Sequence, residues 1–295
     1  MNPSYQRRKL LIAAAAMPLL ASLRPLSAWA GSSSLLQQLA DLEQEVKGRI
    51  GLALLDTNSG EKLTYRGDER FPLCSTFKLL AAAAILRRSQ QQPDLLYQRV
   101  HWTPAEHLAY MPVTAKHQHD GMTIEALCIA ALQYSDNLAG NLLLKVLGGP
   151  AAIADFARSL GDNVTRLDRN EPDLNTAVPG DLRDTTSPQA MLNNLNKLLL
   201  GSGLASSSQE KLAGWLKGNT TGKKAIAAGI PAGWTPGDKT GSGEYGTTND
   251  VAILWRPDAS PLLMAIYFTQ YGKDDRSRQD VLAKTARLAL AALKA

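Results

Sequence analysis

Strand patterns occur only near the two ends of this chain, and helical patterns fill the residues between them. Residues 49–56 and 62–66 read as two strands joined by a turn, and residues 251–255 and 262–268 read as buried strands near the other end. This segregation favours one sheet built by both ends of the chain. We therefore expect an α/β (α+β) fold, in which an antiparallel sheet flanked by helices carries an inserted all-helical domain.

Several helical segments have recognisable starts. Apolar residues at helical spacing predict a helix over residues 35–47, and the alanine-rich stretch 79–86 predicts a buried helix. Thr123, Asp136 and Ser187 each stand where a capping side chain would begin a further helix. A last helix is expected over residues 278–293, after the second pair of strands.

The first 30 residues read as an export signal, with a basic start, an apolar run and a small-x-small cleavage site. These features are Arg7, Arg8 and Lys9, then residues 10–23, then Ala28-Trp29-Ala30. The apolar run is too short, and too interrupted by Pro18, to predict a permanent membrane span. The paired arginines fit a twin-arginine signal, and a plain secretory signal explains the same residues.

The rest of the chain has almost no net charge. Four of the 32 basic residues and none of the 27 acidic residues lie in the signal, which leaves 28 basic and 27 acidic residues in 31–295. This balance gives no basis for nucleic-acid binding. We predict a sheet domain formed by residues 31–66 plus 217–295, and an all-helical domain formed by residues 67–216.

Ser75 and Lys78 are the first candidate catalytic pair. At the start of a helix, residues three apart lie on one face, so the amine can reach the hydroxyl. Serine becomes a useful nucleophile only when a neighbouring base takes its proton. The same spacing recurs at Ser208 and Lys211, which read as an exposed helix start, so the pair alone is weak evidence for catalysis.

Two further short motifs follow in order. Ser135-Asp136-Asn137 stands at a helix start, where an N-cap cluster is the ordinary explanation. Lys239-Thr240-Gly241 is expected on the edge of a strand, where such a tripeptide is common. With Ser75 and Lys78, the two motifs would equip a serine acyl-transferase.

A fourth segment adds a hydrolytic base. Glu171 and Asn175 are four residues apart and can hold one water between them, so that Glu171 can activate it. Arg169 and Asp184 flank this segment as a possible ion pair. An ordinary helix start and a solvated surface bridge are the alternative explanations.

The four motifs in this order resemble those of the class A serine β-lactamases, over essentially all of residues 31–295. Residues 242–250 look like the extended-spectrum, cefotaximase-like branch. The resemblance implies a two-domain fold with the active site in the cleft between the domains. It makes Ser75 the nucleophile, Ser135 the proton relay to the leaving nitrogen and Glu171 the base for deacylation. Whether Lys78 or Glu171 accepts the Ser75 proton during acylation is left open by the sequence.

The resemblance also assigns substrate contacts. Asn137 would bind the side-chain amide of a β-lactam, Lys239 and Thr240 its carboxylate, and Gly241 would let it approach the backbone. The other implied contacts are Asn175, Ser242 (whose N–H pairs with that of Ser75 in an oxyanion hole) and the cleft-wall Tyr110. The arginine that many relatives use for the carboxylate is replaced here, with Thr248, Gln279, Arg276 and Arg278 as candidates in its place.

The two cysteines, Cys74 and Cys128, are expected to be free, buried thiols. Relatives pair a cysteine at one of these positions with a second one, but the required partner positions hold Phe77 and Gly243 here. The family implies neither metal nor organic cofactor, a monomer without stable membrane association, and a periplasmic or secreted location. Its partners would be β-lactam substrates and inhibitors.

Three alternatives follow from the same residues. A cell-wall D,D-peptidase has the same three outer motifs, but would carry a membrane anchor or extra domain and lack the Glu171 segment. A penicillin-sensing module would become acylated and stay so, and would carry transmembrane helices and a signalling region. A zinc site at His117-Gln118-His119-Asp120 is the third, although a catalytic zinc needs three protein ligands. A polar surface turn explains that cluster more simply.

Overall fold

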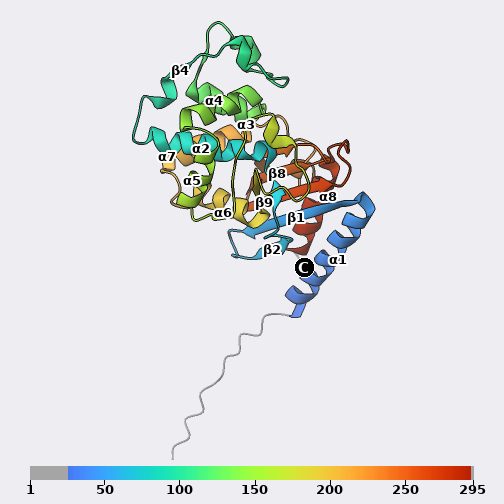
Figure 1. Ribbon diagram of the computed structural model, residues 1–295. Coiled ribbons are helices and arrows are strands. Elements are labelled where there is room, and N and C mark those ends of the chain that lie inside the picture. Colours follow the sequence, from blue (N-terminus) through green and yellow to red (C-terminus); the bar gives the residue numbers. More distant parts are fainter. Residues whose placement is uncertain (1–25, 294–295) are drawn as a thin grey trace, which may run out of the picture.

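The computed structural model of this chain describes residues 26–293, and the side chains of residues 34–293 (Figure 1). The export signal predicted at residues 1–30 therefore lies largely outside the described residues. No helix in 26–293 is both long and apolar enough to cross a bilayer.

One five-stranded antiparallel sheet joins the two ends of the chain, as the sequence predicts. Its strands lie in the order β2-β1-β9-β8-β7. Their bounds are β1 (Gly48–Asp56), β2 (Lys62–Tyr65), β7 (Thr235–Ser242), β8 (Thr248–Arg256) and β9 (Ala259–Gln270). The N-terminal strand β1 pairs with β9 over its whole length, from Gly48 opposite Gln270 to Asp56 opposite Leu262. The C-terminal strand β9 is thus the centre of the sheet.

Helices cover both faces of the sheet. Helices α1 (Leu26–Val46) and α8 (Gln279–Ala292) pack together on one face, as Figure 1 shows. The other face meets α6 (Pro188–Leu199) and α7 (Ser206–Lys217). The remaining helices are α2 (Phe77–Ser89), α3 (Ile124–Gln133), α4 (Asn137–Leu147) and α5 (Ala151–Ser159). Short strands pair as β3 (Phe71–Pro72) with β6 (Thr185–Thr186), and as β4 (Arg99–Val100) with β5 (Met122–Thr123).

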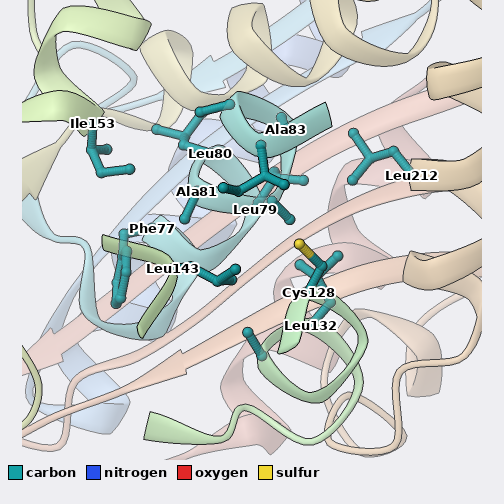
Figure 2. Close-up of a cluster of buried hydrophobic side chains, with 14 of the residues drawn as sticks. Phe77, Leu79, Leu80, Ala81, Ala83, Cys128, Leu132, Leu143, Ile153 and Leu212 are labelled. Atoms are coloured by element: carbon teal, nitrogen blue, oxygen red, sulfur yellow. The ribbon is translucent and has the colours of Figure 1, made fainter. Parts of the chain in front are cut away.

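Helix α2 is the centre of the helical region. Every residue from Phe77 to Leu86 is buried, which agrees with the predicted buried helix at 79–86. Alanines at positions 81–84 allow neighbouring helices to approach α2 on all sides. Figure 2 shows its side chains packed with Cys128 and Leu132 of α3 and Leu143 of α4.

The expected caps are present. The Thr123 hydroxyl accepts a hydrogen bond from the backbone of Ala126, and the Asp136 carboxylate accepts one from Ala139. Ser187 caps α6 in the same way, and Gly148 ends α4 in the left-handed region with φ +106°. These contacts satisfy backbone groups that a helix end leaves open.

Two sequence expectations are corrected. Helix α1 begins at Leu26 rather than residue 35, directly after Pro25, and proline favours helix starts. The predicted cleavage site between Ala30 and Gly31 therefore falls within a helix. Ser208 is buried rather than exposed, and it accepts a hydrogen bond from Gln90 while Lys211 pairs with Glu125.

The two thiols are free and buried, as predicted. A Cβ added at Gly243 would lie 2.7 Å from the Sγ of Cys74, so this position faces Cys74 but supplies no partner sulfur. The domain boundaries at 66/67 and 216/217 stay a prediction.

Candidate active site

Ser75 lies in a tight turn, η1 (Cys74–Thr76), that leads directly into α2. Ser75 is only 7% exposed. Cys74 before it has φ +44°, a left-handed conformation that side-chain-bearing residues rarely adopt. The packed surroundings hold this turn in a strained shape, and such strain is often found at functional sites.

Lys78 contacts four other residues of the site. Its Nζ donates to the Oγ of Ser75 at 2.9 Å, to the backbone oxygen of Ser135 at 2.8 Å and to the Oδ1 of Asn137 at 2.8 Å. It also lies 2.9 Å from the Oε1 of Glu171, and both side chains are fully buried. A buried ammonium is tolerated when a carboxylate compensates its charge. The sequence-predicted residues thus form one continuous hydrogen-bonded group.

Glu171 contacts both Ser75 and Lys78 through one carboxylate oxygen. Its Oε1 accepts from the Ser75 Oγ at 3.2 Å, and its Oε2 accepts a short hydrogen bond from the Nδ2 of Asn175. Asn175 lies in the turn η5 (Asp173–Asn175), so the two side chains meet directly across this turn.

Asn141 is a site residue that the sequence analysis missed. Its Nδ2 donates to the backbone oxygen of Glu171 at 2.9 Å, and its Oδ1 accepts from the Glu171 N–H at 2.8 Å. Asn141 thereby clamps the backbone of the candidate base. One signal was available, because Asn141 follows Asn137 by four residues on α4 and so shares its face.

The loop that carries Glu171 (residues 169–184) is closed at its base by an ion pair between the partly exposed Arg169 and the buried Asp184. Arg169 Nε donates to Asp184 Oδ2 at 2.6 Å, and Asp184 Oδ1 accepts from the backbone of Asp168 and of Arg169 at 2.7 and 3.0 Å. The Asp184 side chain is 1% exposed, so the solvated-bridge alternative is wrong for this pair. Breaking a buried pair on one side leaves an uncompensated charge.

Lys239 and Ser135 form a second hydrogen-bonded pair at the site. Lys239 Nζ donates to the Ser135 Oγ at 3.0 Å and to the Thr240 backbone oxygen at 2.7 Å. Lys239 is fully buried, and burial, together with the nearby charge of Lys78, lowers its pKa to about 7. Ser135 has φ +57°, a second left-handed residue at the site.

A cleft of about 310 Å³ opens over these groups. The predicted residues that line it are Ser75, Tyr110, Ser135, Asn137, Asn175, Thr240, Gly241 and Ser242, and two further lining residues are Thr221 and Gln279. Tyr110 stands at the rim, half-exposed. A Cβ at Gly241 would lie 3.0 Å from the Leu73 backbone oxygen, so this glycine also lets the Ser75 turn approach β7.

The groups beside Thr240 in the cleft are neutral. Thr221 Oγ1 lies 2.5 Å from Thr240 Oγ1, and Gln279 donates to the Thr221 backbone oxygen at 3.1 Å. The Arg278 guanidinium pairs with Asp280 at 2.8 Å, and the cleft lining includes neither Arg278 nor Arg276. The cation that contacts Thr240 is the buried Lys239, through the Thr240 backbone oxygen at 2.7 Å.

Behind Lys239 lie two buried carboxyl groups that sequence reasoning also missed. Asp238 accepts from the Nδ2 of Asn219, and Asp250 accepts from the backbone of Ile226 at 3.1 Å. Burial raises the pKa of both, most strongly that of Asp250. An acidic residue within each of two buried strands was the available signal.

The histidine cluster does not form a metal site. Among the described residues, no group of three or more His, Cys, Asp or Glu side chains is placed to hold a metal ion. His117 ends the turn η4 (Thr114–His117), in agreement with the surface-turn alternative.

Comparison with known proteins agrees with this geometry. The model of the β-lactamase enzyme family matches residues 34–293. The chain is 49% identical to β-lactamase OXY-1 of Klebsiella oxytoca, over 98% of each chain, and 49% identical to β-lactamase CTX-M-8 of Citrobacter amalonaticus, over 96% of each.

Solved structures agree as well. The crystal structure of a β-lactamase from Desulfarculus baarsii is 50% identical, with a TM-score of 0.88 over 90% of this chain and 98% of that one. A variant of the last common ancestor of Gram-negative class A β-lactamases is 53% identical, with a TM-score of 0.86 over 88% and 98% of the two chains. The chain therefore belongs to the β-lactamase enzyme family, as a class A member of the cefotaximase-like type.

Proposed function

We propose that this protein hydrolyses the β-lactam ring of penicillins and cephalosporins through an acyl-enzyme on Ser75, and thereby confers resistance to them. The observation that carries the proposal is the position of the Ser75 Oγ, 2.9 Å from Lys78 Nζ and 3.2 Å from Glu171 Oε1 at the floor of the cleft. A hydroxyl so placed has two bases within hydrogen-bond reach.

In the acylation step, the Ser75 Oγ attacks the β-lactam carbonyl and the ring C–N bond breaks. The Ser75 proton passes to Lys78 or Glu171, since both lie within reach. Ser135, held by Lys239 at 3.0 Å, relays the Ser75 proton from that base to the leaving nitrogen, which restores the base. The backbone N–H groups of Ser75 and Ser242 are proposed to stabilise the oxyanion, usually a large catalytic contribution.

In the deacylation step, Glu171 removes a proton from a water that attacks the Ser75 ester. The ester bond to the Ser75 Oγ then breaks, Glu171 returns the proton to that oxygen, and the acid product leaves. Asn175 and Asn141 hold Glu171 for this step through its carboxylate and its backbone. Lys239 and Thr240 are proposed to hold the substrate carboxylate, and Asn137 the side-chain amide.

The test is a time course with a chromogenic cephalosporin, in which turnover and protein mass are followed together. We expect sustained turnover by the parent, and a stable Ser75 adduct with little turnover in Glu171→Ala. Glu210→Ala, an exposed glutamate on α7, is the matched control and should behave as the parent. A single stoichiometric burst by the parent would favour a peptidase or a sensor and refute the hydrolase.

We also propose a periplasmic location for a monomeric protein. The basic and apolar residues of the predicted signal support export. Cell fractionation with N-terminal mass analysis tests it, and a protein retained uncleaved in the cytoplasm would refute it. Replacement of Arg7 and Arg8 by lysine should stop export only if the twin-arginine route is used.

A further inference from the structure

A second cavity, the outer loop pocket, lies on the far side of the Glu171 loop. It has a volume of about 290 Å³ and is enclosed by loop residues 177–182 and by the paired ends of β1 and β9. It shares no lining residue with the cleft over Ser75. Its volume is near the lower end of the roughly 300–1,000 Å³ typical of small-molecule sites.

The mouth of the outer loop pocket is apolar. Val178, Leu182 and Tyr271 line it, with 44%, 56% and 71% of their surfaces exposed. Single exposed apolar side chains are ordinary, but three gathered at one cavity indicate a binding site for a partly apolar ligand.

The wall of the pocket carries an arginine without an ionic partner. The half-buried Arg70 donates from Nη1 to the Val164 backbone oxygen at 2.8 Å and to the Thr185 hydroxyl at 2.9 Å. No carboxylate among residues 34–293 lies within ion-pair distance of it. Both of its acceptors are neutral, so its charge is not balanced locally.

The other charged groups of the lining are already paired. Arg49 forms an ion pair with Glu69 at 2.9 Å, and Asp181 forms one with Arg183 at 2.7 Å. The pocket therefore combines an apolar mouth with one uncompensated guanidinium. Because a guanidinium fork matches a carboxylate or sulfonate, the complementary ligand is an amphipathic anion.

We propose that the outer loop pocket binds small amphipathic carboxylates or sulfonates, and that binding slows the deacylation step of the proposed reaction. The second part rests on the proposed function. Ala177 lines the pocket and follows Asn175, the partner of Glu171, by two residues. A ligand that moves Ala177 therefore acts on the segment that positions the base.

Backbone strain brackets the segment that the ligand would touch. Ala177 has φ +47° and Asp184 has φ +55°, both in the left-handed region without being glycine. Such a conformation is strained and persists only when its surroundings enforce it. An occupant that changes those surroundings can therefore shift the segment between alternative positions.

The probe is 8-anilinonaphthalene-1-sulfonate, whose binding to the folded protein is measured by calorimetry and whose effect on kcat and KM is measured in parallel. We expect one site per chain and a fall in kcat without a rise in KM. Arg70→Gln and Tyr271→Ser should each raise the Kd at least tenfold. Tyr97→Ser removes a tyrosine of similar exposure, 73%, that does not line the pocket. This control should leave the Kd within twofold.

The outcomes separate the parts of the proposal. Equal effects of Tyr271→Ser and Tyr97→Ser, or competition with substrate, would overturn the pocket as the binding site. Binding at the pocket with unchanged kcat would support the site and overturn its link to deacylation. Because calorimetry needs no turnover, a failure of the hydrolase proposal would leave the binding result standing. Tyr271→Ser, an exposed position, keeps the test usable if Arg70→Gln does not fold.

Discussion

The clamp between Asn141 and the Glu171 backbone gives the sharpest test of how this site is built. Asn141→Ala removes a donor at 2.9 Å and an acceptor at 2.8 Å in one change. It touches neither the Glu171 carboxylate nor Ser75. Glu171 is 3% exposed, but Asn141 and Glu171 both line an open cavity of about 760 Å³, so water reaches one side of the clamp and the cost is lower than for a fully enclosed pair.

The magnitude follows from these two hydrogen bonds. Each contributes about 0.5–1.5 kcal/mol net, and a buried backbone group left without a partner costs about 1–3 kcal/mol. We therefore expect Asn141→Ala to lower the free energy of unfolding by about 2–4 kcal/mol. If all of this free energy shifts the Glu171 loop away from its catalytic position, kcat falls about 30-fold for 2 kcal/mol and about 900-fold for 4 kcal/mol.

The assay combines urea denaturation with steady-state and single-turnover hydrolysis of a chromogenic cephalosporin. Deacylation should slow far more than acylation, so the acyl-enzyme accumulates during turnover. Asn193→Ala, an exposed helical asparagine on α6, serves as the control and should change stability by less than about 0.5 kcal/mol.

A double mutant separates positioning from general destabilisation. If Asn141 acts through Glu171, Asn141→Ala adds no further loss of deacylation in the Glu171→Ala background. Unchanged kcat and stability in Asn141→Ala, or fully additive losses in the double mutant, would refute the clamp.

Three further predictions concern the other buried groups. Because Lys239 has a pKa of about 7 in the folded chain, its ammonium deprotonates as pH rises through 7, so kcat/KM for anionic substrates should fall there. Between pH 7 and about 10, Lys239 is deprotonated in the folded chain and protonated in the unfolded chain, so unfolding takes up a proton. The free energy of unfolding should therefore rise with pH over that window, which denaturation at a series of pH values would measure. Burial raises the Asp250 pKa, which favours its neutral form, so Asp250→Asn should change the free energy of unfolding in urea by no more than about 1 kcal/mol. Asp250→Ala removes the partner of Asp238 and should lower that free energy by about 2–4 kcal/mol. In Gly140→Ala the new Cβ would lie 2.8 Å from Lys78 Cε, so a slower acylation burst in stopped-flow kinetics is expected, and an unchanged burst would show that Lys78 adapts.

The sequence predicted those parts of the fold that depend on local signals. Helix starts at Thr123, Asp136 and Ser187 were predictable because a capping side chain acts within three residues of its own position. The sheet from both chain ends was predictable because the strand patterns are separated so clearly. The start of α1 at Leu26 was missed, because apolar spacing begins only at Leu35 and the preceding residues give no periodic signal.

The motif residues of the site were predictable because each lies in a short, ordered string. Asn141 and Thr221 were missed, since they reach the site only through tertiary packing. The burial of Asp184 was missed for a related reason, because the sequence shows its charge but not the segment that covers it. The buried pair of Asp238 and Asp250 depends on the register of β7 and β8, which no local pattern specifies.

The central place of β9 has a consequence for how the chain acquires its structure. The hairpin of β1 and β2 has no partner strand until residues 259–270 have been synthesised, some 200 positions later. Such non-local pairing delays folding, because the closure entropy of the long intervening loop opposes it. A chain interrupted before residue 259 would leave open the edge of β1 and the edge of β8 that β9 covers in the complete sheet. The two halves of the sheet, one of which carries Lys239, therefore join only after β9 has been synthesised.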